Sequence, residues 1–277
     1  MSPRPRRHRG ADRGGGPRRH GLTLLETMVS ISIVAMLVGL LVPVLGSVRD
    51  EARSATCQSH LRHLGTAMAA YTGAYRGRYP PAIVHFVGTG GLVTHAWDFH
   101  HGPGGEVRPG ALRGFTDRPE LVQQCPCCTE SSTFGNDPAT GYNYNTTYIG
   151  DEGRLPTLDA EGRLVEGWEN ARRGVPASRH RRPASAAVLG DGGWAGGANK
   201  FMRAPSNEVE FDWGTVYAGG QAFRHAGRTN VAWLDGHLSS EPRAHEGPRT
   251  GTAFATEVLG VPRNGFLSSD DAAYDPR

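Results

Sequence analysis

The sequence predicts an α+β protein in which one long N-terminal helix precedes a β-rich body. The first observation is an apolar run over residues 22–45, followed by an amphipathic pattern over residues 46–75. The second is the content of turn-forming residues, 39 Gly and 19 Pro, which argues against an all-helical body. Short apolar and β-branched segments follow residue 76. We expect the helix to pack on an antiparallel sheet with loop-rich insertions.

The apolar run is long enough to cross a membrane. Its 24 residues, at about 1.5 Å each, form a helix of roughly 36 Å, and the hydrocarbon core of a bilayer is about 30 Å thick. The apolar core of a cleaved secretory signal is shorter, at about 7–15 residues. Arginines precede the run and none lies within it. The sequence therefore predicts a single-pass protein with its N-terminus in the cytoplasm and its body outside.

The basic charge of the chain is concentrated at its front. Residues 1–20 contain seven Arg and one acid, Asp12, whereas the rest of the chain holds 23 basic and 26 acidic side chains. The net charge of +3 therefore describes the first segment, and we expect no nucleic-acid partner. The basic run at 179–182 has no interleaved aromatic residues for base stacking, so we interpret it as a solvated loop.

Glu26 is the unusual residue of the apolar run. A carboxylate costs about 2.5–3.5 kcal/mol near the centre of a bilayer and is rarely kept there without a partner. No cation lies within the run, but cleavage after Gly21 would give Leu22 a free α-ammonium group close to Glu26. The alternative is an uncleaved signal anchor with Glu26 near the membrane interface. Further along, Pro43 lacks a backbone donor, and we expect a bend or local melting of the helix there.

This segment resembles the prepilins of the type IV pilin-like family. The shared features are a basic leader ending in Gly21, the sequence Leu-Thr-Leu-Leu-Glu at 22–26, a long apolar run, and Pro43 as the twenty-second residue after the cut. The first residue after the cut is usually Phe in that family, and here it is Leu. The resemblance implies that a membrane prepilin peptidase removes the leader and methylates the new N-terminus. It also implies that Glu26 pairs with the terminal amine of a neighbouring subunit.

By the same resemblance, the protein is a structural pseudopilin-class subunit and not an enzyme. The implied partners are the prepilin peptidase, other pilin-like subunits of a type II secretion or type IV pilus-like filament, and an assembly platform in the bacterial inner membrane. We divide the chain into a leader (1–21), a transmembrane helix (22–45), an amphipathic extension (46–75) and a body in the periplasm or outside the cell (76–277). No cofactor is predicted, although bound calcium or zinc stays open.

The amphipathic extension is expected to lay one face against the body. Its apolar residues recur mainly at three- and four-residue steps, and charged residues fill the other faces. The residues predicted to face the body are Val48, Ala52, Ala55, Leu61, Leu64, Met68 and Tyr71.

Four cysteines, Cys57, Cys125, Cys127 and Cys128, suit one or two disulfides if the body faces an oxidising compartment. Cys125 and Cys128 form a C-x-x-C pair, which could also be a redox couple or a half-site for zinc. We prefer a structural disulfide, with Cys57 bonded to Cys125 so that the helix is fastened to the body. A second group of possible ligands, for zinc or copper, is the histidine-rich stretch with Asp98 at 85–101, which could equally be a surface loop.

Residues 224–238 predict a β-hairpin. An apolar strand at 230–234 is followed by an Asp235-Gly236 turn and a returning strand. His225 and Asp235 have nine residues between them, which is similar to the H-x9-DG element of a bacterial group of prepilin-type proteins abundant in planctomycetes. This pair could be catalytic or metal-binding. Our structural interpretation is that Asp235 and Gly236 make the turn while His225 hydrogen-bonds to backbone and locks the hairpin.

Two other expectations concern the body. Residues 186–189 are a candidate buried strand, which we expect to end in a turn at 191–193, and the acidic end at Asp270 and Asp271 is expected to be frayed. An alternative function keeps the membrane anchor but makes the body a ligand- or metal-binding domain. An anchored hydrolase is disfavoured, because the sequence has no recognisable nucleophile motif.

Overall fold

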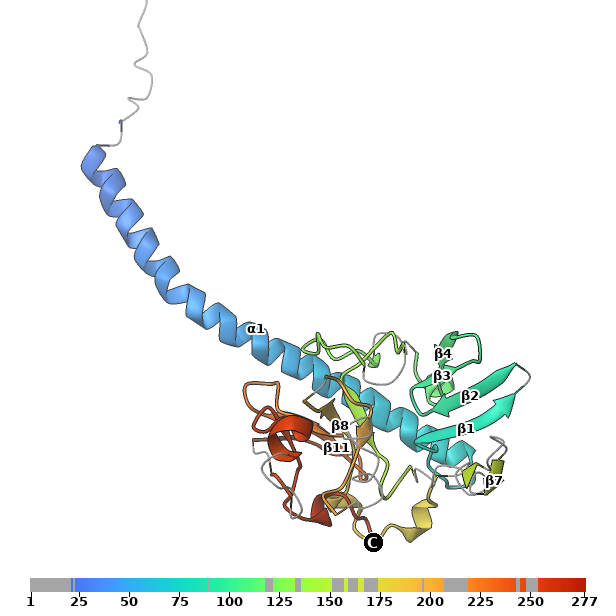
Figure 1. Ribbon diagram of the computed structural model, residues 1–277. Helices are drawn as coiled ribbons and strands as arrows, with labels where there is room; N and C mark the ends of the chain where they lie inside the picture. Colours follow the sequence, from blue (N-terminus) through green and yellow to red (C-terminus); the bar gives the residue numbers. More distant parts are fainter. Residues whose placement is uncertain are drawn as a thin grey trace, which may run out of the picture. The chain divides into compact units, whose positions relative to one another are not determined.

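The computed structural model confirms the α+β class, with one long helix preceding several small β-sheets (Figure 1). The chain divides into two compact units, Met1–Val48 and Arg49–Arg277, which are considered separately. The described residues are 21, 23–88, 90–117, 122–132, 136–150, 157–158, 164–166, 174–195, 197–206, 219–242, 245–247 and 254–277. Residues 1–20 of the predicted leader, and Leu22, lie outside them.

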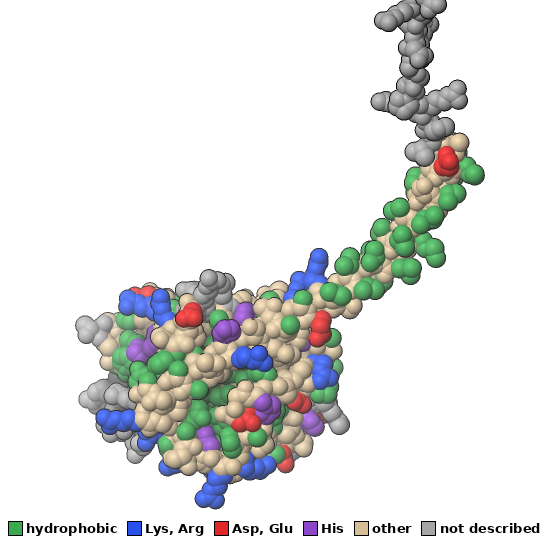
Figure 2. Space-filling view, turned by 180° about the vertical axis from the view of Figure 1, so that it is seen from behind, with side chains coloured by type: hydrophobic (Ala, Val, Ile, Leu, Met, Phe, Trp, Pro, Cys, Tyr) green, Lys and Arg blue, Asp and Glu red, His purple; other side chains and the backbone are tan. Residues whose placement is uncertain are grey.

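Helix α1 (Leu24–Ala74) begins in the first unit and stays helical through Pro43. Of the two outcomes predicted there, a bend or local melting, the melting does not occur. All described helix residues of this unit are exposed within the chain. Hydrophobic side chains cover the surface of this part of α1 (Figure 2). The helix is long and apolar enough to cross a membrane, as the sequence predicted.

The later part of α1 is the core helix of the second unit. Its buried side chains recur every three or four residues, which gives one continuous face. They are Ser54, Cys57, Leu61, Leu64, Ala67, Met68, Tyr71 and Thr72. The prediction was wrong for Val48, Ala52 and Ala55, which are exposed. Burial of the helix begins at Ser54, and apolar periodicity alone cannot show where a helix meets its partner.

The main sheet is built around β8, whose seven residues are all buried. Strands follow the order β12-β11-β8-β10-β13, and β5 pairs antiparallel with β8 and parallel with β9. The strands are β5 (Tyr142–Asn145), β8 (Ala187–Gly193), β9 (Phe201–Met202), β10 (Gly220–Ala222), β11 (Thr229–Trp233), β12 (Leu238–Glu241) and β13 (Asn264–Gly265). Leu61 and Leu64 of α1 share a core cluster with Tyr144 and Leu189 of this sheet.

The remaining elements form smaller layers. An antiparallel four-stranded sheet runs in chain order from β1 to β4, and β6 pairs with β7. These strands are β1 (Ile83–Gly88), β2 (Gly91–Ala96), β3 (Phe99–His101), β4 (Val107–Pro109), β6 (Thr157–Leu158) and β7 (Leu164–Glu166). The short helices are η1 (Arg113–Phe115), η2 (Ala177–Arg179), η3 (Pro183–Ser185), the π-helix η5 (Phe254–Leu259) and η6 (Asp271–Ala273).

The structure corrects the prediction of a turn at 191–193, because β8 continues through these residues. A side chain at Gly192 would clash with the backbone oxygen of Asn199, so glycine is needed here for close approach of two chain segments. The turn-forming appearance of the sequence therefore reflects tight packing within the sheet.

The prediction of a frayed C-terminus is also wrong. Tyr274 is fully buried, and its backbone oxygen accepts a hydrogen bond of 2.9 Å from the side chain of Asn145. The carboxylate of Asp271 accepts hydrogen bonds from Tyr148 and Ser206. The acidic end of the chain is thus part of the packed body.

Candidate functional site

The start of α1 is organised by Thr23 and Glu26. One oxygen of the Glu26 carboxylate, Oε2, accepts hydrogen bonds from the backbone nitrogen and the hydroxyl of Thr23, both at 2.8 Å. In return, the backbone nitrogen of Glu26 donates to the Thr23 hydroxyl at 3.3 Å. This is a capping box, in which two side chains satisfy the free donors at a helix start. The Thr-x-x-Glu spacing could have revealed it in the sequence, where we expected only a partner from outside the helix.

This arrangement leaves the charge of Glu26 available. The groups of Thr23 that donate hydrogen bonds to the carboxylate are uncharged. Among the described residues, no basic side chain contacts the carboxylate. Gly21 is exposed, and a side chain at this position would meet no other atom within 4 Å. Gly21 and Thr23 are therefore uncovered by the described part of the chain.

Residues 16–42 match the family described as the prokaryotic N-terminal methylation motif. The chain has a prepilin-type N-terminus. Searches of curated proteins and of solved structures found no match. A prepilin-type N-terminus indicates a substrate of prepilin peptidase and anchoring by one N-terminal span. The match ends before the body, so the H-x9-DG resemblance stays a prediction.

The hairpin predicted around Asp235 is present, with β11 and β12 paired antiparallel. The Asp235 carboxylate accepts hydrogen bonds from the backbone and ring nitrogens of His237, at 3.1 and 2.6 Å. Gly236 has a φ of +91°, a conformation that favours glycine. The side chain of His225 does not contact this turn. The His225 ring lies instead beside Asp191 of β8. Only the backbone of His225 pairs with Arg228, across the turn at 226–227.

His225 belongs to a buried cluster with Cys57, Cys125 and Asp191, all drawn from different segments of the second unit. The Cys57 and Cys125 sulfurs lie 2.9 Å apart as free thiols. Nε2 of His225 lies 3.2 Å from Oδ2 of Asp191 and 4.0 Å from the Cys125 sulfur. The four ligand atoms are all within 4.8 Å of one another. The structure thus brings together the two predicted disulfide partners, although the disulfide stays a prediction, and it adds two residues that sequence reasoning had not combined with them.

The cluster perturbs its own ionisation. The hydrogen bond between Cys125 and Cys57 lowers the pKa of Cys125 to about 5. Burial opposes this shift, and the hydrogen bond from His225 adds to it. Burial lowers the pKa of His225, but Asp191 and Cys125 outweigh it and raise that pKa to about 9. The hydrogen bond with Cys125 and burial raise the pKa of Cys57. One thiolate can therefore form beside a second thiol, an imidazole and a carboxylate.

The other predicted ligand groups do not converge in the same way. Cys128, the second cysteine of the C-x-x-C pair, is not part of the buried cluster that contains Cys125. Its sulfur lies 3.5 Å from the Thr140 hydroxyl. In the histidine-rich stretch, His85 hydrogen-bonds Thr94 at 2.8 Å, while His95 and His100 stack edge to face. Among the described residues, the one group of three or more possible ligands within reach of a single ion is the buried cluster.

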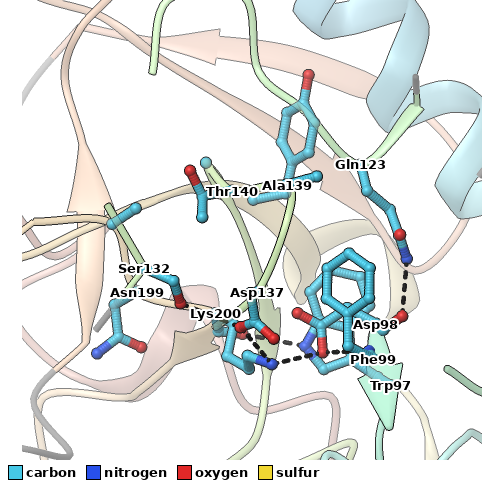
Figure 3. A pocket seen from close by; sticks show the side chains of 13 residues that line it. Trp97, Asp98, Phe99, Gln123, Ser132, Asp137, Ala139, Thr140, Asn199 and Lys200 are labelled. Carbon is cyan, nitrogen blue, oxygen red and sulfur yellow. Dashed lines mark hydrogen bonds and ion pairs between the residues drawn. The ribbon is translucent and has the colours of Figure 1, made fainter. Parts of the chain in front are cut away.

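A second polar cluster surrounds Lys200, the single lysine of the chain. Its ammonium group lies 2.8 Å from Asp98 and 2.7 Å from Asp137 (Figure 3). Asp137 also pairs with His101 at 2.9 Å. The side chains of Lys200, Asp98 and Asp137 are all buried, with exposures of 2–7%. The backbone of Lys200 accepts a hydrogen bond from Trp97. The ion pair between Asp98 and Lys200 joins the residue before β3 to the residue before β9. The rarity of lysine in the sequence is the one signal that could have pointed to it.

Burial, reinforced by the Asp137 carboxylate and opposed by Lys200, raises the pKa of Asp98 to about 6. The folded protein therefore holds this proton between about pH 4 and 6, where the unfolded chain releases it, so stability falls as the pH rises through this window. We expect the destabilisation caused by Asp98→Asn to be smaller at pH 7.5 than at pH 4, because the variant has no carboxyl to ionise. Melting temperatures of both proteins at the two pH values measure this, and a difference independent of pH would contradict it.

Proposed function

We propose that the protein is a pilin-like structural subunit, cleaved after Gly21, methylated at Leu22 and assembled into a type II secretion or type IV pilus-like filament. The observation that carries this proposal is the prepilin-type N-terminus at residues 16–42. A helix of 51 residues, apolar at its start and packed into a folded body at its end, suits a subunit anchored by its helix and exposing its body.

The exposed apolar surface of the first unit supports assembly through the helix. Large side chains along it are half or more exposed, including Leu24 at 77% and Met36 at 71%. Such a surface is stable in lipid or against other apolar helices, and not in water. We infer that the same surface contacts lipid before assembly and neighbouring subunits afterwards.

The charge of Glu26 gives the assembly step its specificity. A carboxylate among apolar helices is costly without a cation. The α-ammonium group created by cleavage on a neighbouring subunit is a suitable partner, since the Thr23 hydrogen bonds leave the carboxylate charged. The partners in this proposal are the prepilin peptidase, other pilin-like subunits and an inner-membrane assembly platform. The body lies in the periplasm or outside the cell.

Replacing Gly21 with Val is expected to block processing, because a branched side chain would occupy open space that the peptidase must enter. Co-expression with a prepilin peptidase, followed by mass spectrometry of the N-terminus, measures the result. The wild type should begin at methylated Leu22, and Gly21→Val should keep the leader. The same change at Gly10 is the control and should be processed normally. A wild-type protein that keeps its leader in the presence of an active peptidase would overturn the proposed function.

A further inference from the structure

We propose that Cys57, Cys125, Asp191 and His225 bind one Zn²⁺ ion in a closed structural site that fastens α1 to the body. The four residues come from α1, from the segment before β5, from β8 and from the β10–β11 connection. All four are buried, and their ligand atoms lie within 4.8 Å of one another. Two sulfurs, one imidazole nitrogen and one carboxylate oxygen are a ligand set that suits tetrahedral zinc.

The use of the His225 ring distinguishes a metal site from a catalytic one. In a nucleophile, base and carboxylate arrangement, the imidazole presents one nitrogen to the nucleophile and the other to the carboxylate. Here Nε2 faces both Cys125, at 4.0 Å, and Asp191, at 3.2 Å. The opposite nitrogen, Nδ1, has no hydrogen-bond partner among the residues that the structure describes. Convergence on one nitrogen fits ligands around an ion, and complete burial leaves no access for a substrate.

The distances are close to those of a zinc tetrahedron. With zinc bonds of about 2.3 Å to sulfur and 2.0–2.1 Å to nitrogen or oxygen, neighbouring ligand atoms lie roughly 3.3–3.8 Å apart. The separations of Nε2 from Asp191 and Cys125 lie on either side of this range. The two sulfurs, at 2.9 Å, would move apart by roughly 0.9 Å to reach it.

A disulfide between Cys57 and Cys125 is the competing explanation, but it leaves one oxygen of the buried Asp191 carboxylate without a partner in the described part of the chain. One carboxylate oxygen, Oδ2, accepts a hydrogen bond of 2.7 Å from the backbone of Asn230, whereas Oδ1 has no partner within the described residues. A buried carboxylate with an unsatisfied oxygen is costly unless a cation neutralises it. Zn²⁺ bound to Asp191 and two thiolates would leave a net charge of −1 at the site. The nearby guanidinium of Arg224 balances this negative charge.

The surroundings already hold the ligands in place. Asn230 donates its backbone hydrogen to Asp191 and accepts a hydrogen bond of 3.0 Å from Gln58, which lies one residue after Cys57 on α1. Partners of this kind orient ligands around structural metals. The proposed ion would therefore connect the helix and the sheet through bonds that do not depend on apolar packing.

The test uses the full chain, purified in detergent without chelator. Zinc is measured by atomic emission, and thiols are counted by alkylation in denaturant without reductant, followed by mass spectrometry. We expect one zinc per chain and four alkylated cysteines. Two alkylated cysteines, or no zinc in a protein that also fails to bind added Zn²⁺, would overturn the proposal, the former in favour of the disulfide.

Variants assign the ligands. Asp191→Ala and His225→Ala are expected to lower zinc affinity at least tenfold, whereas Cys127→Ser should leave it unchanged, because Cys127 lies outside the cluster. Substituted Co²⁺ gives a second readout, since thiolate ligation in a tetrahedral site produces visible absorption bands in the folded protein. If wild-type protein binds Co²⁺ without these bands, or if both variants fold and keep full zinc affinity, the assignment is wrong.

Discussion

Glu26→Gln is expected to reduce incorporation of the processed protein into filaments at least tenfold, without affecting membrane insertion or cleavage. Glutamine keeps an oxygen that can accept the hydrogen bonds of Thr23, so the capping box is preserved. Only the negative charge is lost. Removing one member of a buried charge pair costs about 2–5 kcal/mol, which corresponds to more than a tenfold change in association. The ratio of filament-bound to membrane-bound protein in sheared cell fractions measures the effect.

Thr23→Ala is the matched control for this variant. It removes the hydroxyl that exchanges hydrogen bonds with Glu26 but leaves the carboxylate charged. We expect a helix start that is weaker by about 1 kcal/mol, with near-normal assembly. If Thr23→Ala abolishes assembly and Glu26→Gln does not, the capping box and not the charge is the assembly determinant. Normal assembly of both variants would remove Glu26 from the mechanism.

Lys200→Met is expected to destabilise the second unit by about 3–5 kcal/mol, the largest stability effect of any single change considered. The substitution leaves Asp98 and Asp137 buried without the cation that both contact. Methionine fills a similar volume, so the loss reports on charge and not on a cavity. Chemical denaturation of wild type and variant at pH 7.5, followed by fluorescence, measures the change in unfolding free energy.

Two comparisons separate the buried charge from a general effect of removing a cation. Arg108→Met removes the partner of Glu106 from an exposed pair at 3.6 Å, with side-chain exposures of 75% and 55%, and should change stability by less than about 1 kcal/mol. Combining Lys200→Met with Asp98→Asn and Asp137→Asn should recover much of the lost stability, because no buried charge then lacks a partner. A Lys200→Met effect no larger than that of Arg108→Met would show that the buried pair adds nothing.

The features at the N-terminus could be predicted because they are local. Gly21, Glu26 and the apolar run lie within 25 residues. The length of the apolar run predicts a lipid environment, and in lipid the carboxylate of Glu26 is costly without a partner. The helix to Ala74 and the Asp235-Gly236 hairpin are also set by short-range patterns, helical periodicity and turn preference. Each could be identified from neighbouring residues without knowledge of the body.

Tertiary structure alone decided the partners of the buried polar residues. Asp191 resembled a turn residue in the sequence, but packing of Gly192 against another segment extends β8 and places the carboxylate beside His225. The Lys200 cluster likewise unites side chains from three separate parts of the chain. Which distant segments meet depends on how the sheet closes over α1, because long-range contacts leave no periodic signal in the sequence. The sequence by itself therefore determined the anchor and its processing signal, and the fold determined where charge and metal-binding groups converge.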